Sequence, residues 1–283
     1  MKYHIVLFLC VVCACTTHPT TINNKLIQFD HDLRSLQSKS SVKTEQFALM
    51  AYVPYTSGKK YPKPLYILQS QVTQKVKAIL KTVASKSTTL SAHEKNMLNT
   101  TQVNQSGGLH VTIFVTNAVP TTKKECVIDS ILQTLQEEHA TLKKHFNVPI
   151  PADAQLEVFG NFVVLVFPAE SFKPWENTMK KATTSITDNC DIANDFFTSR
   201  PWRAHVSLCR ISLDGFVIKK TVVSPGISLD KHITSVLKKL PRPKIDLLAT
   251  VALDTLVFSA LGQTSKPLTL KFNADLQQWG LRK

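Results

Sequence analysis

The chain has 283 residues with 43% apolar side chains, enough for one large domain or two fused lobes. Only 19% of the residues are charged and glycine is scarce, which excludes collagen-like and globally disordered classes. A formal net charge of +14 favours anionic partners, such as nucleic acid, phosphorylated ligands or anionic lipid surfaces. The lysines occur as scattered pairs, which is typical of solvated surface, so the charge identifies no particular ligand.

The first fifteen residues resemble an export signal. Lys2 gives a positive start, and residues 5–12 form an apolar core that is too short to span a bilayer. The segment ends in Val12-Cys13-Ala14-Cys15, which resembles a bacterial lipobox and predicts lipidation of Cys15. An ordinary signal peptide cleaved near Ala14 is the alternative. We therefore expect an exported lipoprotein on the outer-membrane or periplasmic side, or else a secreted protein, and no transmembrane helix.

Residues 16–45 are rich in Thr, Ser, Asn and Lys, which predicts a flexible tether before one domain at 46–283. Residues 86–108 form a long polar insertion within that domain. Alternating and helical spacings predict, in chain order, a strand at 47–55, a helix at 66–85, a strand at 109–116, a helix at 122–146, a hairpin at 156–167, a helix at 171–198, a strand at 204–211, a helix near 230–240 and strands near 245–260 and 267–273. This order predicts an α+β fold, and an approximate internal duplication would explain its two similar halves.

Three cysteines lie in the expected domain: Cys126, Cys190 and Cys209. We expect them to be unpaired buried thiols. A Cys126–Cys190 bridge is the alternative, because both residues lie in expected helices and an oxidising compartment would permit one disulfide. The expected domain contains no Cys-x-x-Cys or His-Glu-x-x-His spacing, and the one Cys-x-x-Cys, Cys10 to Cys13, lies in the expected export signal, so we expect no metal site and no cofactor.

The tripeptide His-x-Thr/Ser occurs five times, beginning at His18, His110, His139, His205 and His232. His18 lies in the expected tether. His139 and His232 lie in helical patterns, where residues two apart point about 200° from one another and cannot share a ligand. His110 and His205 lie in expected strands, where alternation places each imidazole and the hydroxyl two residues later on the face opposite the apolar side chains. We call the four side chains concerned the motif quartet: His110, Thr112, His205 and Ser207.

The motif quartet predicts phosphodiester hydrolysis. This reaction needs a base that activates water and an acid that protonates the leaving oxygen. Two imidazoles with pKa values near ~6.5 can hold these complementary protonation states near neutral pH. The two hydroxyls can donate hydrogen bonds to the non-bridging phosphate oxygens.

Three segments carry a resemblance to a known family: Arg203 to Arg210 (RAHVSLCR), Phe47 to Ala51 (FALMA) and Thr255 to Ser259 (TLVFS). With the two motifs, they resemble the two-histidine phosphoesterase superfamily, which includes bacterial 2′,5′ RNA ligase-like proteins and RNA 2′,3′-cyclic phosphodiesterases. The resemblance spans roughly residues 45–275. It implies a bilobed α+β fold, with two antiparallel sheets flanked by helices around a central cleft. It also implies a catalytic motif quartet, with His205 as base and His110 as acid when a cyclic phosphate is opened.

The expected substrate is a nucleotide or RNA phosphodiester: a 2′,3′-cyclic phosphate, a 2′,5′ linkage or a cyclic nucleotide. Tyr52, Phe114, Trp202 and Arg210 are candidates for substrate contacts, and we expect a monomer. The main alternative is a non-catalytic lipoprotein that binds phosphorylated ligands or RNA in the same cleft. An exported effector that acts on host nucleotides is a further possibility that the sequence leaves open.

Overall fold

The computed structural model describes residues 43–54, 62–198, 201–212, 218–244, 246–261 and 267–282. The chain divides into two compact units, Met1–Thr44 and Glu45–Lys283. The expected export signal, Cys15 and almost all of the expected tether lie outside the described residues, so these assignments stay predictions. Among the described residues, no helix is both long and apolar enough to cross a membrane.

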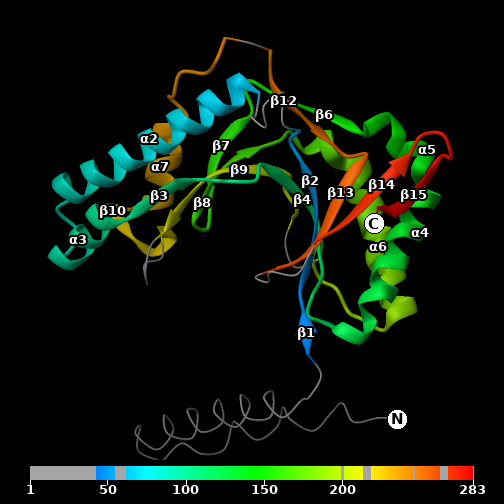
Figure 1. The fold of residues 1–283 in the computed structure, drawn as a ribbon. Coiled ribbons are helices and arrows are strands. Elements are labelled where there is room, and N and C mark those ends of the chain that lie inside the picture. The colour runs from blue at the N-terminus through cyan, green and yellow to red at the C-terminus, as the bar shows by residue number, and fades with distance from the viewer. Residues whose placement is uncertain are drawn as a thin grey trace, which may run out of the picture. The chain divides into compact units, whose positions relative to one another are not determined.

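A nine-stranded antiparallel sheet forms the centre of the second unit (Figure 1). Its strands are β2 (Phe47–Tyr52), β3 (Gln102–Gln105), β4 (His110–Val115), β7 (Gln155–Phe159), β8 (Phe162–Val166), β9 (His205–Ser212), β13 (Thr255–Ala260), β14 (Leu268–Asn273) and β15 (Gln278–Arg282). Eight strands follow the order β15-β14-β13-β2-β4-β9-β8-β7, and β3 pairs with the second half of β9. The α+β expectation is therefore confirmed. The two expected sheets are halves of one sheet, which meet where β4 pairs with β9.

Shorter elements connect the main strands. They are β1 (Thr44–Glu45), β5 (Val119–Pro120), β6 (Asn147–Pro151), β10 (Val222–Ser224), β11 (Ile227–Ser228), β12 (Leu247–Ala252) and the 3₁₀ turns η1 (Thr121–Lys123), η2 (Lys143–His145), η3 (Ala169–Phe172) and η4 (Ile218–Lys220). β6 pairs with β12, and β10 pairs with β11. The sequence did not indicate β6, because two prolines interrupt its short pattern.

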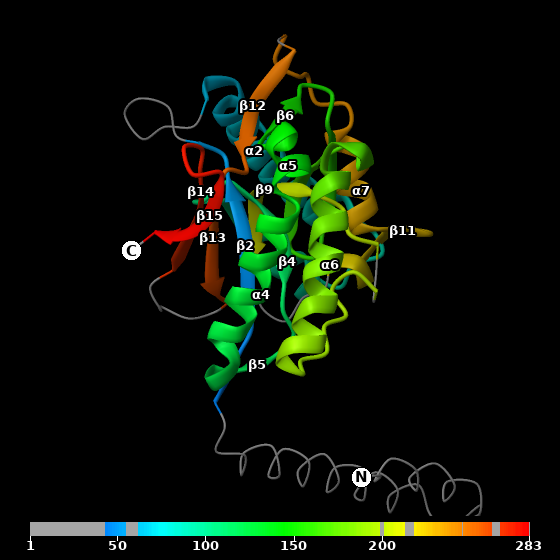
Figure 2. The ribbon, with the colours of Figure 1, turned by 90° about the vertical axis from the view of Figure 1, so that its right-hand side faces the viewer.

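Two groups of helices pack on the two halves of the sheet. The helices are α2 (Lys63–Lys86), α3 (Ala92–Thr100), α4 (Lys124–Glu137), α5 (His139–Leu142), α6 (Lys173–Cys190) and α7 (Leu229–Leu237). α2 packs against β3 and β9, and α7 packs against β7. α4 and α6 pack against one another and contact β15 and β4 respectively. In Figure 2 both of these helices lie in front of β2 and β4.

Alternation along the central strands gives the sheet one buried face and one partly open face. Ala51, Val111 and Val206 are completely buried on the helix-covered face. Burial of each such valine side chain contributes roughly 1.5–3 kcal/mol. Tyr52 and the motif quartet occupy the opposite face and are only half-buried. The alternation predicted from the two motifs is therefore confirmed. The side chains that could take part in catalysis lie on the face that helices leave open.

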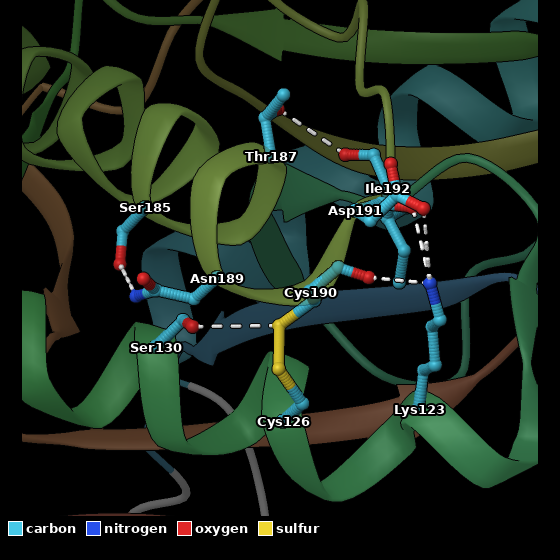
Figure 3. Close-up of a disulfide and its surroundings, with 9 residues drawn as sticks. All are labelled: Lys123, Cys126, Ser130, Ser185, Thr187, Asn189, Cys190, Asp191 and Ile192. Atoms are coloured by element: carbon cyan, nitrogen blue, oxygen red, sulfur yellow. Dashed lines mark hydrogen bonds and ion pairs between the residues drawn. A yellow bond between two sulfur atoms is a disulfide. The ribbon is translucent and has the colours of Figure 1, made fainter. Parts of the chain in front are cut away.

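A disulfide joins Cys126 of α4 to Cys190 at the end of α6 (Figure 3). The expectation of three unpaired thiols is therefore wrong for this pair, and the alternative bridge is the correct one. The two helices pack side by side and bring the Cα atoms to 5.9 Å, a separation that a disulfide spans. Cys209 is a free, buried thiol, and its burial raises its pKa to about 11.

Three expected elements differ from the structure. The helix expected at 122–146 is divided into α4, α5 and the 3₁₀ turn η2. The polar segment 86–108 contains α3 and β3. A capping box begins α3, since Ser91 accepts a hydrogen bond from the backbone of Glu94 while the Glu94 carboxylate accepts one from the backbone of Ser91. The helix expected at 171–198 ends at Cys190, because Asp191 adopts a left-handed conformation with φ of 51°.

Candidate active site

The two motif strands are direct neighbours in the centre of the sheet. β4 and β9 run antiparallel with Val111 opposite Val206. One step along this ladder in each direction brings His110 opposite Ser207 and Thr112 opposite His205. Residues that lie opposite one another share a face, so the motif quartet forms one patch on the open face. The two histidines are diagonal neighbours within it, a relation that separates residues by roughly 7–8 Å in a regular sheet.

Each motif strand contains a bulge directly after its motif. The register between β2 and β4 shifts by one residue after Thr112, and the register between β8 and β9 shifts by one residue after Ser207. As a result, two consecutive side chains are buried beyond each motif: Ile113 with Phe114, and Leu208 with Cys209. A bulge bends the strand and increases its local twist, which is why bulges are common beside active sites.

Both imidazoles are held by the same local contact. Nδ1 of His110 lies 2.7 Å from the carbonyl oxygen of Gly108, and Nδ1 of His205 lies 2.7 Å from the carbonyl oxygen of Arg203. A carbonyl only accepts hydrogen bonds, so Nδ1 must be the nitrogen that carries the proton in each neutral ring. Nε2 is then the nitrogen at which each ring takes up or releases a proton.

Burial changes the electrostatic environment of the His110 ring. Desolvation lowers the pKa of His110 below its ordinary value of 6.5, and the hydrogen bond to the Gly108 carbonyl opposes this only in part. Tyr52, opposite His110 in the register of β2 and β4, contributes to the burial with its ring centroid 5.3 Å from the imidazole. His110 is therefore favoured in its neutral form at pH 7.

A second group of side chains surrounds His205. The Phe159 ring meets its imidazole edge to face, with centroids 5.0 Å apart. The Arg203 guanidinium lies 5.3 Å from the centre of the Phe159 ring. It also donates two hydrogen bonds of 2.6 and 2.7 Å to the Glu157 carboxylate, which hold the pKa of that carboxyl below its usual range. Sequence reasoning missed Glu157 and Phe159, since they lie on β7, which only the strand order β9-β8-β7 brings near His205.

A buried glutamine connects the two motif segments behind the patch. Gln69 of α2 is 2% exposed, and its Nε2 donates to the carbonyl oxygens of Ser106 and Leu208, each at 2.9 Å. Leu208 is the extra residue of the β9 bulge, and Ser106 lies two positions before the carbonyl that holds His110. Gln69 therefore stabilises the position of one motif relative to the other.

The solved structures that are similar to this chain include two of Escherichia coli LigT. The Escherichia coli LigT structure complexed with 3′-AMP is 11% identical, with a TM-score of 0.33, and covers 85% of this chain and 97% of its own. The LigT structure complexed with NADP⁺ is 9% identical, with a TM-score of 0.31, and covers 85% of this chain and 96% of its own. Because both TM-scores lie below 0.5, the likeness to LigT supports no argument about activity. No protein-family model and no curated protein matches the chain.

The four expected substrate contacts have different surroundings. Tyr52 lies beside His110, as described above. Trp202 is half-buried three positions before His205, between Phe172 and Phe197. The remaining two candidates differ in the exposure of their side chains. Arg210 is exposed, with its guanidinium 6.0 Å from the centre of the Phe162 ring. Phe114 is completely buried among other aromatic rings. We therefore do not propose Phe114 as a substrate contact.

No group of three or more His, Cys, Asp and Glu side chains in the described part of the chain is arranged to hold a metal ion.

Proposed function

We propose that this protein is a phosphodiesterase that hydrolyses nucleotide or RNA phosphodiesters by two-histidine acid–base catalysis. The observation that carries this proposal is the motif quartet on one open face of adjacent strands, with both imidazoles tethered through Nδ1. A tethered ring has a defined tautomer and orientation, which general acid–base catalysis requires.

The reaction follows from the arrangement. The neutral imidazole accepts a proton from water at Nε2, and the water oxygen forms a bond to phosphorus. The bond between phosphorus and the leaving oxygen breaks, and the imidazolium donates its Nε2 proton to that oxygen. The hydroxyls of Thr112 and Ser207 donate hydrogen bonds to the non-bridging oxygens, where negative charge accumulates in the transition state. After turnover the two rings have exchanged protonation states, and solvent restores them.

Burial of His110 favours a particular division of roles. A ring whose pKa is lowered is neutral at pH 7, and a neutral ring acts as the base. We therefore propose His110 as base and His205 as acid for water attack, the reverse of the roles that the family resemblance implied. The diagonal symmetry of the patch allows the roles to exchange when the substrate binds in the opposite direction.

The test is turnover of a phosphodiester panel by the purified protein: nucleoside 2′,3′-cyclic phosphates, a 2′,5′-linked dinucleotide and 3′,5′-cyclic nucleotides, each with and without a chelator. His110→Ala and His205→Ala should each lower kcat/KM by about 10²–10⁴-fold, the usual contribution of a general acid or base. His232→Ala is the matched control, because it removes a histidine from the same tripeptide on helix α7.

Two results would contradict the proposal. One is a His110→Ala/His205→Ala double variant with wild-type turnover. The other is a wild-type protein that binds the substrates tightly and hydrolyses none, which would instead favour the binding-protein alternative. Activity should survive the chelator, because the two rings supply both the acid and the base.

We also propose that the protein is exported and anchored through Cys15. The signal-like sequence at 1–15 supports this, and so does the Cys126–Cys190 disulfide, because structural disulfides persist mainly in oxidising compartments.

A further inference from the structure

Helix α2 concentrates positive charge on its exposed side. Its 24 residues include five lysines and no aspartate or glutamate. The five lysine side chains are all exposed: Lys63, Lys75, Lys77, Lys81 and Lys86. With a rise of about 1.5 Å per residue, they extend over roughly 35 Å of the helix axis. The neighbouring helices α3 and α7 do not offset this charge, because each contains one acidic residue and one lysine.

The α2 lysines differ from the lysines of α6, on the other half of the sheet. In α6, Lys173 and Lys180 are paired with Glu176, and Lys181 is paired with Glu138. Among the residues that the structure describes, no carboxylate forms an ion pair with a lysine of α2. The positive charge of α2 therefore faces solvent without a neighbouring negative charge that would reduce its field.

Two large apolar side chains are exposed near the beginning of α2. Tyr66 is 53% exposed and Ile67 is 38% exposed. The opposite side of α2 packs on the helix-covered face of the sheet, where Gln69 donates a hydrogen bond to the Leu208 carbonyl oxygen of β9 (Figure 1). The exposed side of α2 therefore points away from the motif quartet, which lies on the open face of the same sheet.

We propose that the exposed side of α2 binds the surface of an anionic lipid bilayer, with its lysines against the headgroups and Tyr66 and Ile67 inserted at the interface. A bilayer surface presents negative charge over a plane, so the attractions of lysines along one helix add to one another. Tyrosine is enriched at membrane interfaces, and the apolar side chains of interfacial helices are buried there. The proposal depends neither on turnover nor on lipidation of Cys15.

The position of α2 favours a bilayer over RNA as the partner. An RNA strand bound along α2 would lie on the face of the sheet opposite the two imidazoles, and so away from the groups proposed to cleave it. A bilayer on that side instead leaves the motif quartet facing solvent. Binding through α2 thus orients the protein with its open face accessible to soluble molecules.

The test is co-sedimentation of the purified protein with two kinds of vesicle: phosphatidylcholine alone, and phosphatidylcholine mixed with phosphatidylglycerol. A lipid anchor contributes to binding of both, so the difference between them measures the electrostatic part. In Lys75→Gln/Lys77→Gln/Lys81→Gln, the partition coefficient for mixed vesicles should fall about 100-fold, from about fivefold per lysine. Glutamine preserves helix propensity, so α2 should stay folded. Tyr66→Ala/Ile67→Ala should lower the same coefficient about tenfold, because less apolar surface is buried at the interface.

The matched control is Lys143→Gln/Lys144→Gln/Lys271→Gln, which removes the same charge from exposed positions on the other half of the sheet. Its partition coefficient should stay within about threefold of the wild type, because these lysines lie beyond the screening length of about 8 Å from a membrane bound by α2. Equal losses in the two triple variants would show that net charge alone causes binding and would overturn the proposal. Wild-type binding in the α2 variant would overturn it as well.

Two further measurements test the partner and the orientation. Acetylation of lysines, mapped by mass spectrometry, should be reduced by mixed vesicles at Lys75, Lys77 and Lys81 and unchanged at Lys271. Equal protection of Lys271 would refute the orientation. The α2 triple variant should also bind a 2′-O-methyl RNA oligonucleotide as the wild type does. Loss of RNA binding with unchanged vesicle binding would assign the surface to RNA and overturn the lipid proposal.

Discussion

Replacing both Cys126 and Cys190 with alanine should lower the free energy of unfolding by about 4 kcal/mol. The bridge closes a loop between positions that are 64 residues apart. A cross-link of this span restricts the unfolded chain strongly, and the entropy lost scales with the logarithm of the loop length. For a domain of this size, the same loss corresponds to a fall in melting temperature of roughly 8–16 °C.

The surroundings of the bridge explain why its loss should not destroy the fold. Lys123 donates hydrogen bonds of 2.7 and 3.2 Å to the carbonyl oxygens of Cys190 and Asp191, so it caps the end of α6 without the sulfurs (Figure 3). The helices also pack along their buried sides. Turnover at low temperature should therefore stay within several-fold of the wild type.

Urea unfolding with and without a reductant measures the effect. Reduction of the wild type should reproduce the loss seen in the double alanine variant, and the variant itself should be insensitive to the reductant. Cys209→Ala is the control, because that thiol is free and its variant should keep the full response to reduction. A wild type whose unfolding free energy changes by less than about 1 kcal/mol on reduction would refute the entropic reasoning. Failure to find a Cys126–Cys190 linked peptide by mass spectrometry would refute the pairing itself.

Four further outcomes are expected. Thr112→Ala and Ser207→Ala should each lower kcat by about 10–10³-fold with a smaller change in KM, since they remove donors to the developing charge, as steady-state kinetics would show. Because the pKa of His110 is lowered in the folded state, the unfolded state binds more protons between that pKa and 6.5. The free energy of unfolding should therefore rise with pH across this window. In His110→Gln, the urea midpoint should depend less steeply on pH than in the wild type. Gln69→Leu should lower the free energy of unfolding by about 1–3 kcal/mol, because it leaves buried carbonyl groups with fewer hydrogen-bond donors. It should also lower kcat. An unchanged kcat would show that the glutamine does not position the motifs. Cys15→Ala should abolish incorporation of labelled fatty acid, and equal labelling of wild type and variant would reject the lipobox.

The sequence was informative wherever side-chain alternation was regular. The faces of β4 and β9 were read correctly because an apolar residue stands on each side of His110 and His205. The hairpin between β7 and β8 was recognisable from Gly160, which adopts a φ of 56° in the turn. By contrast, α3 was missed because Leu98 is its only buried side chain, although the spacing of Ser91 and Glu94 is a helix-start signal that the sequence does contain.

The surroundings of His205 could not be predicted because they depend on the order of the strands in the sheet. Glu157 lies 46 positions before Arg203, and no local pattern indicates that their side chains meet. Phe159 is visible in the sequence only as a residue beside a turn. Its contact with His205 arises because β7 and β9 both pair with β8. The Arg203–Glu157 ion pair and the Phe159 ring near His205 can therefore be identified only once the order of the strands in the sheet is known.

The paired bulges are the feature that sequence reasoning was least able to find, and they bear on how the patch is built. A bulge appears in the sequence only as two consecutive apolar residues, such as Ile113-Phe114, which resemble the ordinary end of an alternating strand. In the structure, the same irregularity follows each motif at the same position, and each imidazole contacts the carbonyl two residues before it. This shared motif, bulge and tether agree with the approximate internal duplication that the order of elements in the sequence suggested. Because both copies shift register just after the hydroxyl, each strand bends away beyond the motif while its histidine and hydroxyl stay in line with those of its neighbour. The shared motif, bulge and tether thus keep both imidazoles on the open face of two adjacent strands.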